Sequence, residues 1–155
     1  MPFLPKNLVI ISAFLSLAVA ATSVSAKDKD YGTLHPFTTD GCTDFPNGTP
    51  DKPNRWLACC VHHDLLYWAG GSIEQKLKAD EYLFKCVAEK DEPFIAAIMF
   101  AGVAIGGTPW IKDPSRWGYG WPKLRGFHHL SDEEMEQVKQ LSPQNLDQLI
   151  EQLSN

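Results

Sequence analysis

The residues best suited to chemistry stand in one short run, Cys59–Asp64, which reads CCVHHD, and at a single acid, Asp80, further along the chain. A buried carboxylate needs a partner. A histidine held by a buried aspartate keeps one tautomer and becomes a competent general base. Because no serine or free cysteine is placed as a nucleophile, the nucleophile in such a site would be water. The run therefore predicts a hydrolysis in which His63 and Asp80 activate water.

Two helices must bring these residues together. The stretch Trp56–Ala69 predicts a helix, and the two glycines that follow it are a typical C-terminal stop. Ser72 starts a second helix, with Gln75 three residues later as its capping-box partner, and this helix runs to about Lys90. Because the connection is so short, we expect the two helices to lie antiparallel.

The expected register of this hairpin pairs His63 with Asp80. In an antiparallel pair the residue numbers of facing positions add to a nearly constant value, which is about 143 for a turn centred between residues 71 and 72. His63 and Asp80 meet that value, and Cys59 and Cys86 come close to it. A disulfide between Cys59 and Cys86 would then join the helices about one turn from the His–Asp pair.

The four cysteines of the chain fit two disulfides. An even count in an exported protein is typical of disulfide bonding. Neighbours on a helix do not easily reach disulfide geometry, which disfavours a Cys59–Cys60 bond. Cys60 points about 100° away from Cys59 on the same helix, so it is left for Cys42 in the preceding loop. Each bridge would add roughly 3 kcal/mol of stability.

Asp64 predicts a second kind of site beside the His–Asp pair. It is turned about 100° from His63, in the direction from which the loop with Asp40 and Gly41 would return if its cysteine is tied to the helix. A carboxylate together with free loop carbonyls is an oxygen site that suits Ca²⁺. An ion there would polarise an ester carbonyl while His63 activates the water.

The spacing of these residues resembles that of a known family. The pattern Cys-Cys-x-x-His-Asp-x-x-Tyr at positions 59 to 67 is similar to the active-site helix of secreted phospholipases A2. In that family the orienting aspartate stands six residues before the cysteine bonded to the first cysteine of the motif, and here Asp80 stands six before Cys86. A calcium-loop cysteine pairs there with the second helix cysteine, which corresponds to Cys42 with Cys60. The resemblance covers about Asp40–Val87 and is closest in style to the short bacterial members.

The resemblance implies a calcium-dependent esterase that releases fatty acid from the sn-2 ester of glycerophospholipids, with membrane surfaces or micelles as its substrate. His63 would be the general base, and Asp80 would orient it. Tyr67 would hydrogen-bond to Asp80. His62 occupies a variable position of the motif and is expected to be exposed.

The resemblance also implies a calcium site, with Asp64 as one ligand. The animal enzymes have a glycine-rich loop, Cys-Gly-x-Gly-Gly, whereas residues 40 to 46 here read DGCTDFP. This loop is more similar to that of the bacterial members, in which an aspartate before the loop cysteine and a neighbouring carbonyl help to bind calcium. The resemblance therefore assigns these roles to Asp40 and to the carbonyl of Gly41. The carbonyls of Thr43 and Phe45 are second choices.

The first residues and the composition indicate an exported protein with one domain. A positive Lys6, an apolar run over Leu8–Ala21 and the small residues before position 27 predict a signal peptide at residues 1–26, cleaved after Ala26. The alternative is a membrane anchor, but the run is shorter than the roughly 20 residues that a span needs. Residues 27–155 then form a single secreted or periplasmic domain, in which 13 basic and 19 acidic residues leave a net charge of −6. Such an acidic domain is a poor candidate for binding nucleic acid, and its charge would not draw it to an anionic membrane.

The rest of the chain predicts further helices, so the expected fold class is all-α. Pro93–Ile105 is apolar nearly all round and predicts a third helix, buried at the centre. The second helix is expected to bury an apolar stripe with Asp80 in its gap. The members of that stripe are Ile73, Leu77, Phe84 and Val87.

Two segments near the C-terminus allow alternatives. The aromatic segment Trp110–Trp121 is either a loop that packs over the core or a lipid-facing rim, since Trp and Tyr favour membrane interfaces. Leu130–Asn155 predicts two short amphipathic helices, either a docked structural hairpin or a partner-binding tail. Ser131 and Glu134 form a capping box for the first, and Ser142 precedes a proline where the second would start.

Three other interpretations fit parts of the sequence. One is an inactive phospholipase-like domain that binds lipid or protein because its altered loop fails to hold calcium. Another is a purely structural His–Asp pair that specifies helix packing. The third is a zinc site, although thiolate ligands suit a reducing compartment; its ligands would be Cys59, Cys60, Cys86 and either His62 or His63. Catalysis is favoured because every residue of the His, Asp and Tyr motif is present.

Overall fold

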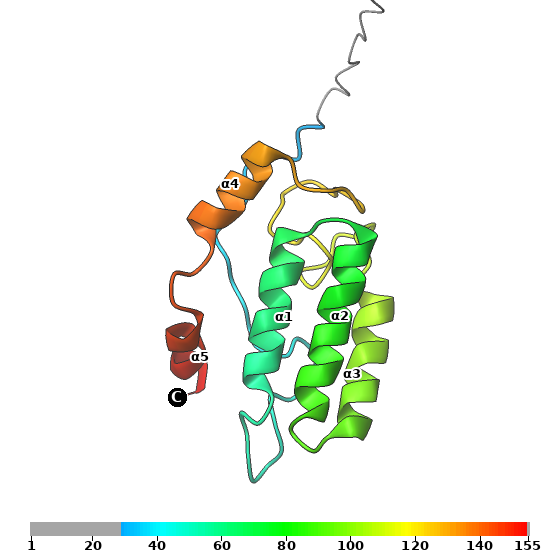
Figure 1. Ribbon diagram of the computed structural model, residues 1–155, viewed down its shortest axis with the longest axis vertical. Coiled ribbons are helices and arrows are strands. Elements are labelled where there is room, and N and C mark those ends of the chain that lie inside the picture. Colours follow the sequence, from blue (N-terminus) through cyan, green and yellow to red (C-terminus); the bar gives the residue numbers. More distant parts are fainter. Residues whose placement is uncertain (1–28, 155) are drawn as a thin grey trace, which may run out of the picture.

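The computed structural model describes residues 29–154, so the predicted signal peptide at residues 1–26 lies outside the described part. Residues 29–154 form five α-helices and no strand, which confirms the all-α fold class. The first three helices stand side by side, with α2 between α1 and α3 (Figure 1). The helices are α1 (Leu57–Ala69), α2 (Ile73–Ala88), α3 (Pro93–Gly106), α4 (Asp132–Leu141) and α5 (Leu146–Ser154).

The first two helices form the predicted antiparallel hairpin. α1 begins one residue later than predicted and ends at Ala69, and Gly70 follows it with a φ of 70°, a left-handed conformation that suits glycine. A Cβ on Gly70 would lie 2.9 Å from the Cα of Gly118, so the close approach of that segment also requires glycine. Ser72 caps α2, and Gln75 completes the predicted capping box.

Two disulfides tie this hairpin, and both pairings are those that the sequence predicts. Cys59–Cys86 joins α1 to α2 with the Cα atoms 5.7 Å apart. Cys42–Cys60 ties the preceding loop to α1 with the Cα atoms 5.0 Å apart. All four cysteines pack with Trp56 in an apolar cluster at this end of the hairpin, Cys86 from its partly buried edge. Disulfides of this kind indicate an oxidising compartment.

The buried face of α2 differs from the predicted one. Ile73, Leu77 and Phe84 are 41%, 56% and 37% exposed, and only Val87 of the predicted stripe is buried. The side chains that face the core are Lys76, Ala79, Asp80, Leu83 and Val87. The helix is rotated about its axis because it has a neighbour on each side, and the stripe that meets both neighbours includes a lysine. Hydropathy alone assigns lysine to solvent, so the pattern predicted the wrong stripe.

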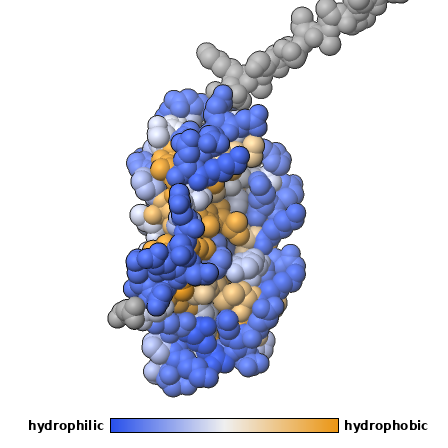
Figure 2. Space-filling view, turned by 60° about the vertical axis from the view of Figure 1, so that its left-hand side comes forward, coloured by the Kyte–Doolittle hydropathy of each residue, from blue (hydrophilic) through white to orange (hydrophobic). Residues whose placement is uncertain are grey.

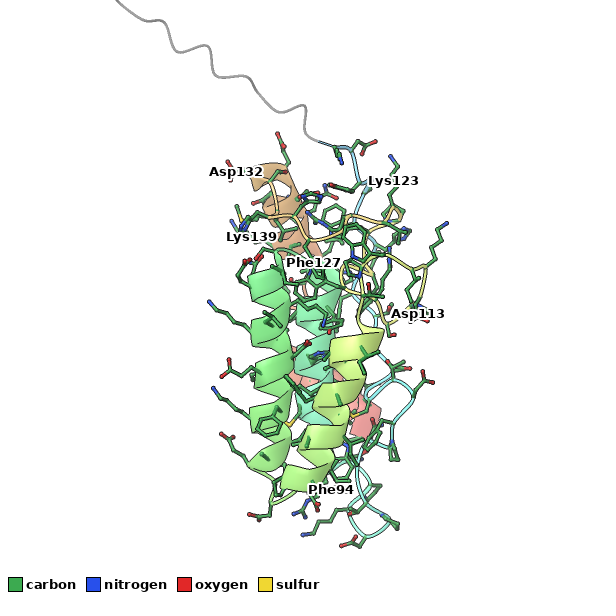
Figure 3. All side chains as sticks on the ribbon, turned by 90° about the vertical axis from the view of Figure 1, so that its right-hand side faces the viewer. Phe94, Asp113, Lys123, Phe127, Asp132 and Lys139 are labelled. Carbon is green, nitrogen blue, oxygen red and sulfur yellow. A yellow bond between two sulfur atoms is a disulfide. The ribbon has the colours of Figure 1, made fainter. Side chains whose placement is uncertain are left out.

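α3 is not the buried central helix that its composition predicts. Only Ala96 and Met99 are buried, whereas Phe94 and Ile105 are 75% and 81% exposed. α3 packs along α2 but stands at the edge of the three-helix layer, so α2 covers only one of its faces. Figure 3 shows Phe94 at one end of this helix, on the outside of the molecule. Within residues 29–154, no helix is long and apolar enough to cross a bilayer.

Part of the aromatic segment packs over the turn that joins α1 to α2, as one of its two interpretations predicts. Trp117 and Trp121 are each 1% exposed. The indole N–H of Trp117 donates to the carbonyl of Gly71 at 3.0 Å, and that of Trp121 donates to the carbonyl of Ala69 at 2.8 Å. Trp110 is 62% exposed and is the member of the segment that faces outward.

Of the last two helices, the first begins at its predicted cap and the second does not. Ser131 caps α4 with the reciprocal partner Glu134, as predicted. α5 does not begin beside Ser142. It begins at residue 146, where the side chain of Asn145 accepts a hydrogen bond from the backbone N–H of Gln148 at 3.0 Å. Asparagine is as good an N-cap as serine, and here Asn145 stands directly before the first residue of the helix.

The predicted C-terminal hairpin is wrong, because α4 and α5 do not pack against each other as a pair. α4 contributes Val138 and Leu141 to the cluster around Trp68 and Trp121, and α5 contacts α1 instead. The two helices follow one another along one side of the molecule. Figure 2 brings that side forward and shows hydrophilic residues over most of it, with apolar ones in a hollow between them.

The edge position of α3 predicts a contrast between two of its residues. We expect Met99→Ala to lower the free energy of unfolding by about 2–3 kcal/mol, because Met99 is 7% exposed. Ile105→Ala removes a comparable apolar side chain that is already in water, so we expect a change below about 0.5 kcal/mol. Urea unfolding of the disulfide-bonded protein measures both, and equal losses would show that α3 is covered on both sides.

Candidate functional site

His63 and Asp80 meet inside the α1–α2 hairpin, at the register that the sequence predicts. Nε2 of His63 lies 3.3 Å from Oδ1 of Asp80. His63 is 5% exposed and Asp80 is fully buried, so the contact is shielded from water. Because a carboxylate accepts hydrogen bonds, Nε2 carries the hydrogen and the lone pair of Nδ1 is left for another partner.

Asp80 has three hydrogen-bond donors, one more than the predicted pair of His63 and Tyr67. The hydroxyl of Tyr67 donates to Oδ1 at 2.6 Å, as predicted, and Nζ of Lys76 donates to Oδ2 at 2.7 Å. Lys76 is 4% exposed and also donates to the carbonyl of Val103 in α3 at 3.1 Å. Its ammonium lies 5.4 Å from the centre of the Tyr67 ring. The buried carboxylate is therefore both satisfied and neutralised, and its partners link all three helices of the layer.

Sequence reasoning missed Lys76. The signal was present, because Lys76 and Asp80 are four residues apart and so share one face of a helix. An acid that is expected to be buried needs its charge compensated, and the cation four residues before it is the first residue to consider. The sequence pattern gave Asp80 the histidine as its partner, and the family resemblance added Tyr67, but neither included Lys76.

These contacts set the charges of the site. Burial raises the pKa of Asp80, but the hydrogen bonds from its three partners outweigh burial and hold that pKa below its ordinary value. Burial lowers the pKa of His63 in spite of the opposing effect of Asp80, so the imidazole is neutral at neutral pH. Burial and the charge of Asp80 raise the pKa of Tyr67, which keeps its hydroxyl protonated and able to donate.

His63 lines a cavity of about 290 Å³ that is bounded by α1, α2, α3, the loop before α1 and the segment after α3. Nδ1 has no hydrogen-bond partner within residues 29–154, and Oδ1 of Asp64 is 4.0 Å away. Most of the cavity wall is apolar, which suits a hydrocarbon group better than a polar one. The apolar side chains of the wall are those of Phe45, Leu83, Ile98, Met99 and Val103.

Asp64 lines the same cavity and is held by the loop. Its Oδ2 accepts a hydrogen bond from the Thr39 hydroxyl at 2.6 Å, and that hydroxyl in turn accepts one from the backbone N–H of Gly41 at 3.1 Å. Burial raises the pKa of Asp64 to about 7, and the nearby charge of Asp40 acts in the same direction while the hydrogen bond from Thr39 opposes it. No lysine or arginine in the described chain pairs with Asp64. It is a carboxylate that lacks a compensating cation.

The residues around Asp64 fit a calcium ion in their donor chemistry. Asp40 is exposed, and its Oδ1 accepts a hydrogen bond from the Thr43 hydroxyl at 2.8 Å. Gly41 is buried with a φ of 84°, and a Cβ there would meet the side chain of Asn47 at 2.5 Å, so this tight loop turn requires glycine. Two carboxylates and loop carbonyls are the hard oxygen donors that calcium prefers. No three His, Cys, Asp or Glu side chains of residues 29–154 gather into a metal site, so an ion here would also need carbonyls and water.

The zinc interpretation is wrong for the part of the chain that the structure describes. All four cysteines are bonded in pairs, so no thiolate is left as a ligand. His62 is half-buried rather than exposed, and its ring lies 5.9 Å from that of Tyr82 on α2. It belongs to the helix contact and not to the cavity.

Comparison with known proteins gives no relative. No family model, no curated protein and no solved structure matches this chain. The function must therefore be argued from the site itself: a neutral histidine with one free nitrogen, an apolar cavity and an uncompensated acid.

The buried ion pair predicts that Lys76 is needed for stability. We expect Lys76→Met to lower the free energy of unfolding by about 3 kcal/mol, because it leaves Asp80 buried with its negative charge unpaired. Lys78→Met is the matched control, since Lys78 is exposed on the same helix and its loss should cost below about 0.5 kcal/mol. Chemical unfolding of both variants measures the difference, and similar small losses would refute the role of Lys76.

The raised pKa of Asp64 predicts how its stability contribution depends on pH. The folded chain keeps the Asp64 proton up to about pH 7, whereas the unfolded chain releases it near pH 4. Between these values the folded state binds more protons, so ionisation of Asp64 removes stability as the pH rises. In the presence of a chelator, the free energy of unfolding of Asp64→Asn should therefore rise by about 2 kcal/mol relative to that of wild type as the pH increases from about 5 to about 7.

Thermal unfolding of both proteins across this pH range measures that gain. A stability difference that stays constant with pH would contradict it. Calcium at about pH 7 should raise the melting temperature of wild type and leave that of Asp64→Asn unchanged, since the ion would supply the missing positive charge.

Proposed function

We propose that this chain is a calcium-dependent phospholipase A2 that releases fatty acid from the sn-2 ester of glycerophospholipids. One observation carries the proposal: the buried imidazole of His63 is bonded to Asp80 through Nε2 and presents Nδ1, its basic nitrogen, to an apolar cavity. A neutral histidine in that arrangement is suited to take a proton from water. The apolar wall beside it suits the acyl part of a lipid.

In the proposed reaction, a water molecule in the cavity attacks the carbonyl carbon of the ester, and its proton moves to Nδ1 of His63. The imidazolium that forms is stabilised by Asp80 through the hydrogen bond at Nε2. When the bond between the carbonyl carbon and the glycerol oxygen breaks, Nδ1 returns the proton to that oxygen. The products are a fatty acid and a lysophospholipid, and His63 is neutral again.

Lys76 and Tyr67 act through Asp80 in this proposal. Their hydrogen bonds occupy the carboxylate on both oxygens, so its position and charge are fixed before the substrate arrives. A base whose orientation is set in advance needs no rearrangement during the reaction. Both are therefore positioning residues.

Calcium would be held by the side chains of Asp64 and Asp40 and by the carbonyl of Gly41. When bound, it supplies the positive charge that the oxygen of the attacked carbonyl requires. The raised pKa of Asp64 supports this assignment, because a cation removes the cause of the shift. The loop carbonyls are neutral oxygen donors, so they would bind the ion without any change of protonation.

The compartment agrees with this activity. The two disulfides belong to an oxidising environment, and we place the protein outside the cytoplasm after removal of residues 1–26. The hairpin, its two bridges and the loop at residues 40–46 support membership of the phospholipase A2 superfamily, near its short bacterial members.

The direct test is release of fatty acid from phosphatidylcholine vesicles. Wild type should be active with calcium and inactive with a chelator. His63→Asn should lower the rate by a factor of about 10²–10⁴, because the base is lost. The adjacent His62→Asn is the matched control and should keep the rate, since His62 does not line the cavity.

Each alternative has its own outcome in this assay. Release that survives the chelator would refute the metal role. Vesicle binding by wild type without any release would favour the inactive lipid-binding interpretation. Melting temperatures of both variants close to that of wild type confirm that a loss of rate is not a loss of fold.

A further inference from the structure

Gly102 in α3 is a residue that neither packing nor helix stability explains. It stands inside the helix, four residues before the end, where glycine is less favourable than alanine. A Cβ built on Gly102 meets no atom within 4 Å, so no neighbour requires the small residue. Its backbone conformation is ordinary, since it is not among the residues with positive φ. Yet Gly102 lines the cavity beside His63.

Two other residues of α3 share this wall with Gly102. Ile98 stands four residues before it and Gly106 four residues after it, so the three form one row along the helix. A Cβ on Gly106 also meets nothing within 4 Å. Along this row the wall beyond Ile98 is bare backbone for about two turns of helix, while Met99 and Val103 line the cavity beside it. Both glycines are exposed, and a side chain at either would stand in open space at the cavity wall.

The other walls of this space are apolar. Leu83 of α2 and Met99 of α3 are 2% and 7% exposed and pack in the core beside the disulfides. The polar groups of the cavity include His63 and Asp64 on α1, with Nδ1 of His63 4.0 Å from Oδ1 of Asp64, and Thr43, Asp44 and Ser115 on loops. A ligand that fits both parts has a polar reacting end at α1 and an unbranched hydrocarbon part along α3.

We infer that Gly102 sets the width of the acyl-chain site. Because Gly102 has no side chain, a long, straight acyl chain can pass along α3 at this position. This inference rests on the proposed phospholipase activity and names the part of the substrate that α3 contacts. It also accounts for the glycine: a less stable helix is kept because a side chain would fill the site.

The test compares Gly102→Leu with wild type on phosphatidylcholines of short and long acyl chains. The variant should lose at least about tenfold in kcat/KM on the long-chain substrate relative to the short-chain one, because the leucine occupies the space of several methylenes. Gly102→Ala should give a smaller loss in the same direction. Both variants should melt at or above the temperature of wild type, since a side chain there clashes with nothing and favours the helix.

The matched control is Ala104→Leu, which adds bulk to an exposed position of the same helix outside the cavity. It should leave the chain-length preference unchanged. Equal losses on short and long chains in Gly102→Leu, or the same shift in Ala104→Leu, would overturn the inference.

A binding measurement separates this inference from the proposed reaction. Calorimetry with a long-chain alkylphosphocholine, below the concentration at which it forms micelles, should show binding to wild type and at least tenfold weaker binding to Gly102→Leu. If wild type hydrolyses no phospholipid but shows this difference, the hydrolase proposal fails and the chain site stands. If wild type does not bind the probe, or both proteins bind it equally, the chain site is refuted.

Discussion

The buried carboxylate of Asp80 is the group on which the rest of the molecule depends. A negative charge without water must be satisfied locally, and its donors come from α1, through His63 and Tyr67, and from its own helix, through Lys76. Lys76 extends the network to a carbonyl of α3. One acid thus sets how three helices lie against each other. It does so in a way that apolar contacts alone do not, because a slip of register by one residue would leave a charge unpaired.

Two aspartates of the same site have opposite environments, and that difference assigns their roles. Asp80 is held by three donors and has a lowered pKa, so it is a fixed anion that orients a base. Asp64 is buried and held by one hydroxyl beside another acid, and its pKa is raised to about 7 because its anionic form lacks a counter-charge. Environments that push two titratable groups apart are a general mark of sites that do chemistry. The neutral His63 lies between the two.

Much of this site could be predicted from the sequence, because it depends on local rules. Glycines at a turn and a capping box fix a hairpin, and the hairpin fixes which residues face each other, so the His63–Asp80 contact and both disulfides followed. What failed depends on neighbours that a single helix does not reveal. Pro93–Ile105 was expected to be buried, but the helix there is covered from one side only. Lys76 was not in the predicted buried stripe, because hydropathy assigns lysine to solvent, whereas the acid one turn later pairs with it in the core.

The cap that residues 117–121 place on α1 has a consequence for how the protein assembles. The last carbonyls of α1, at Tyr67 and Trp68, accept hydrogen bonds from the backbone N–H groups of Gly118 and Gly120 at 2.6 and 3.2 Å. The two indole donors reach back across 46 and 52 residues. All four cysteines precede that cap in the chain. Because non-local contacts of this kind form late in folding, we expect the disulfides to form while the end of the helix that sets their register is still uncapped.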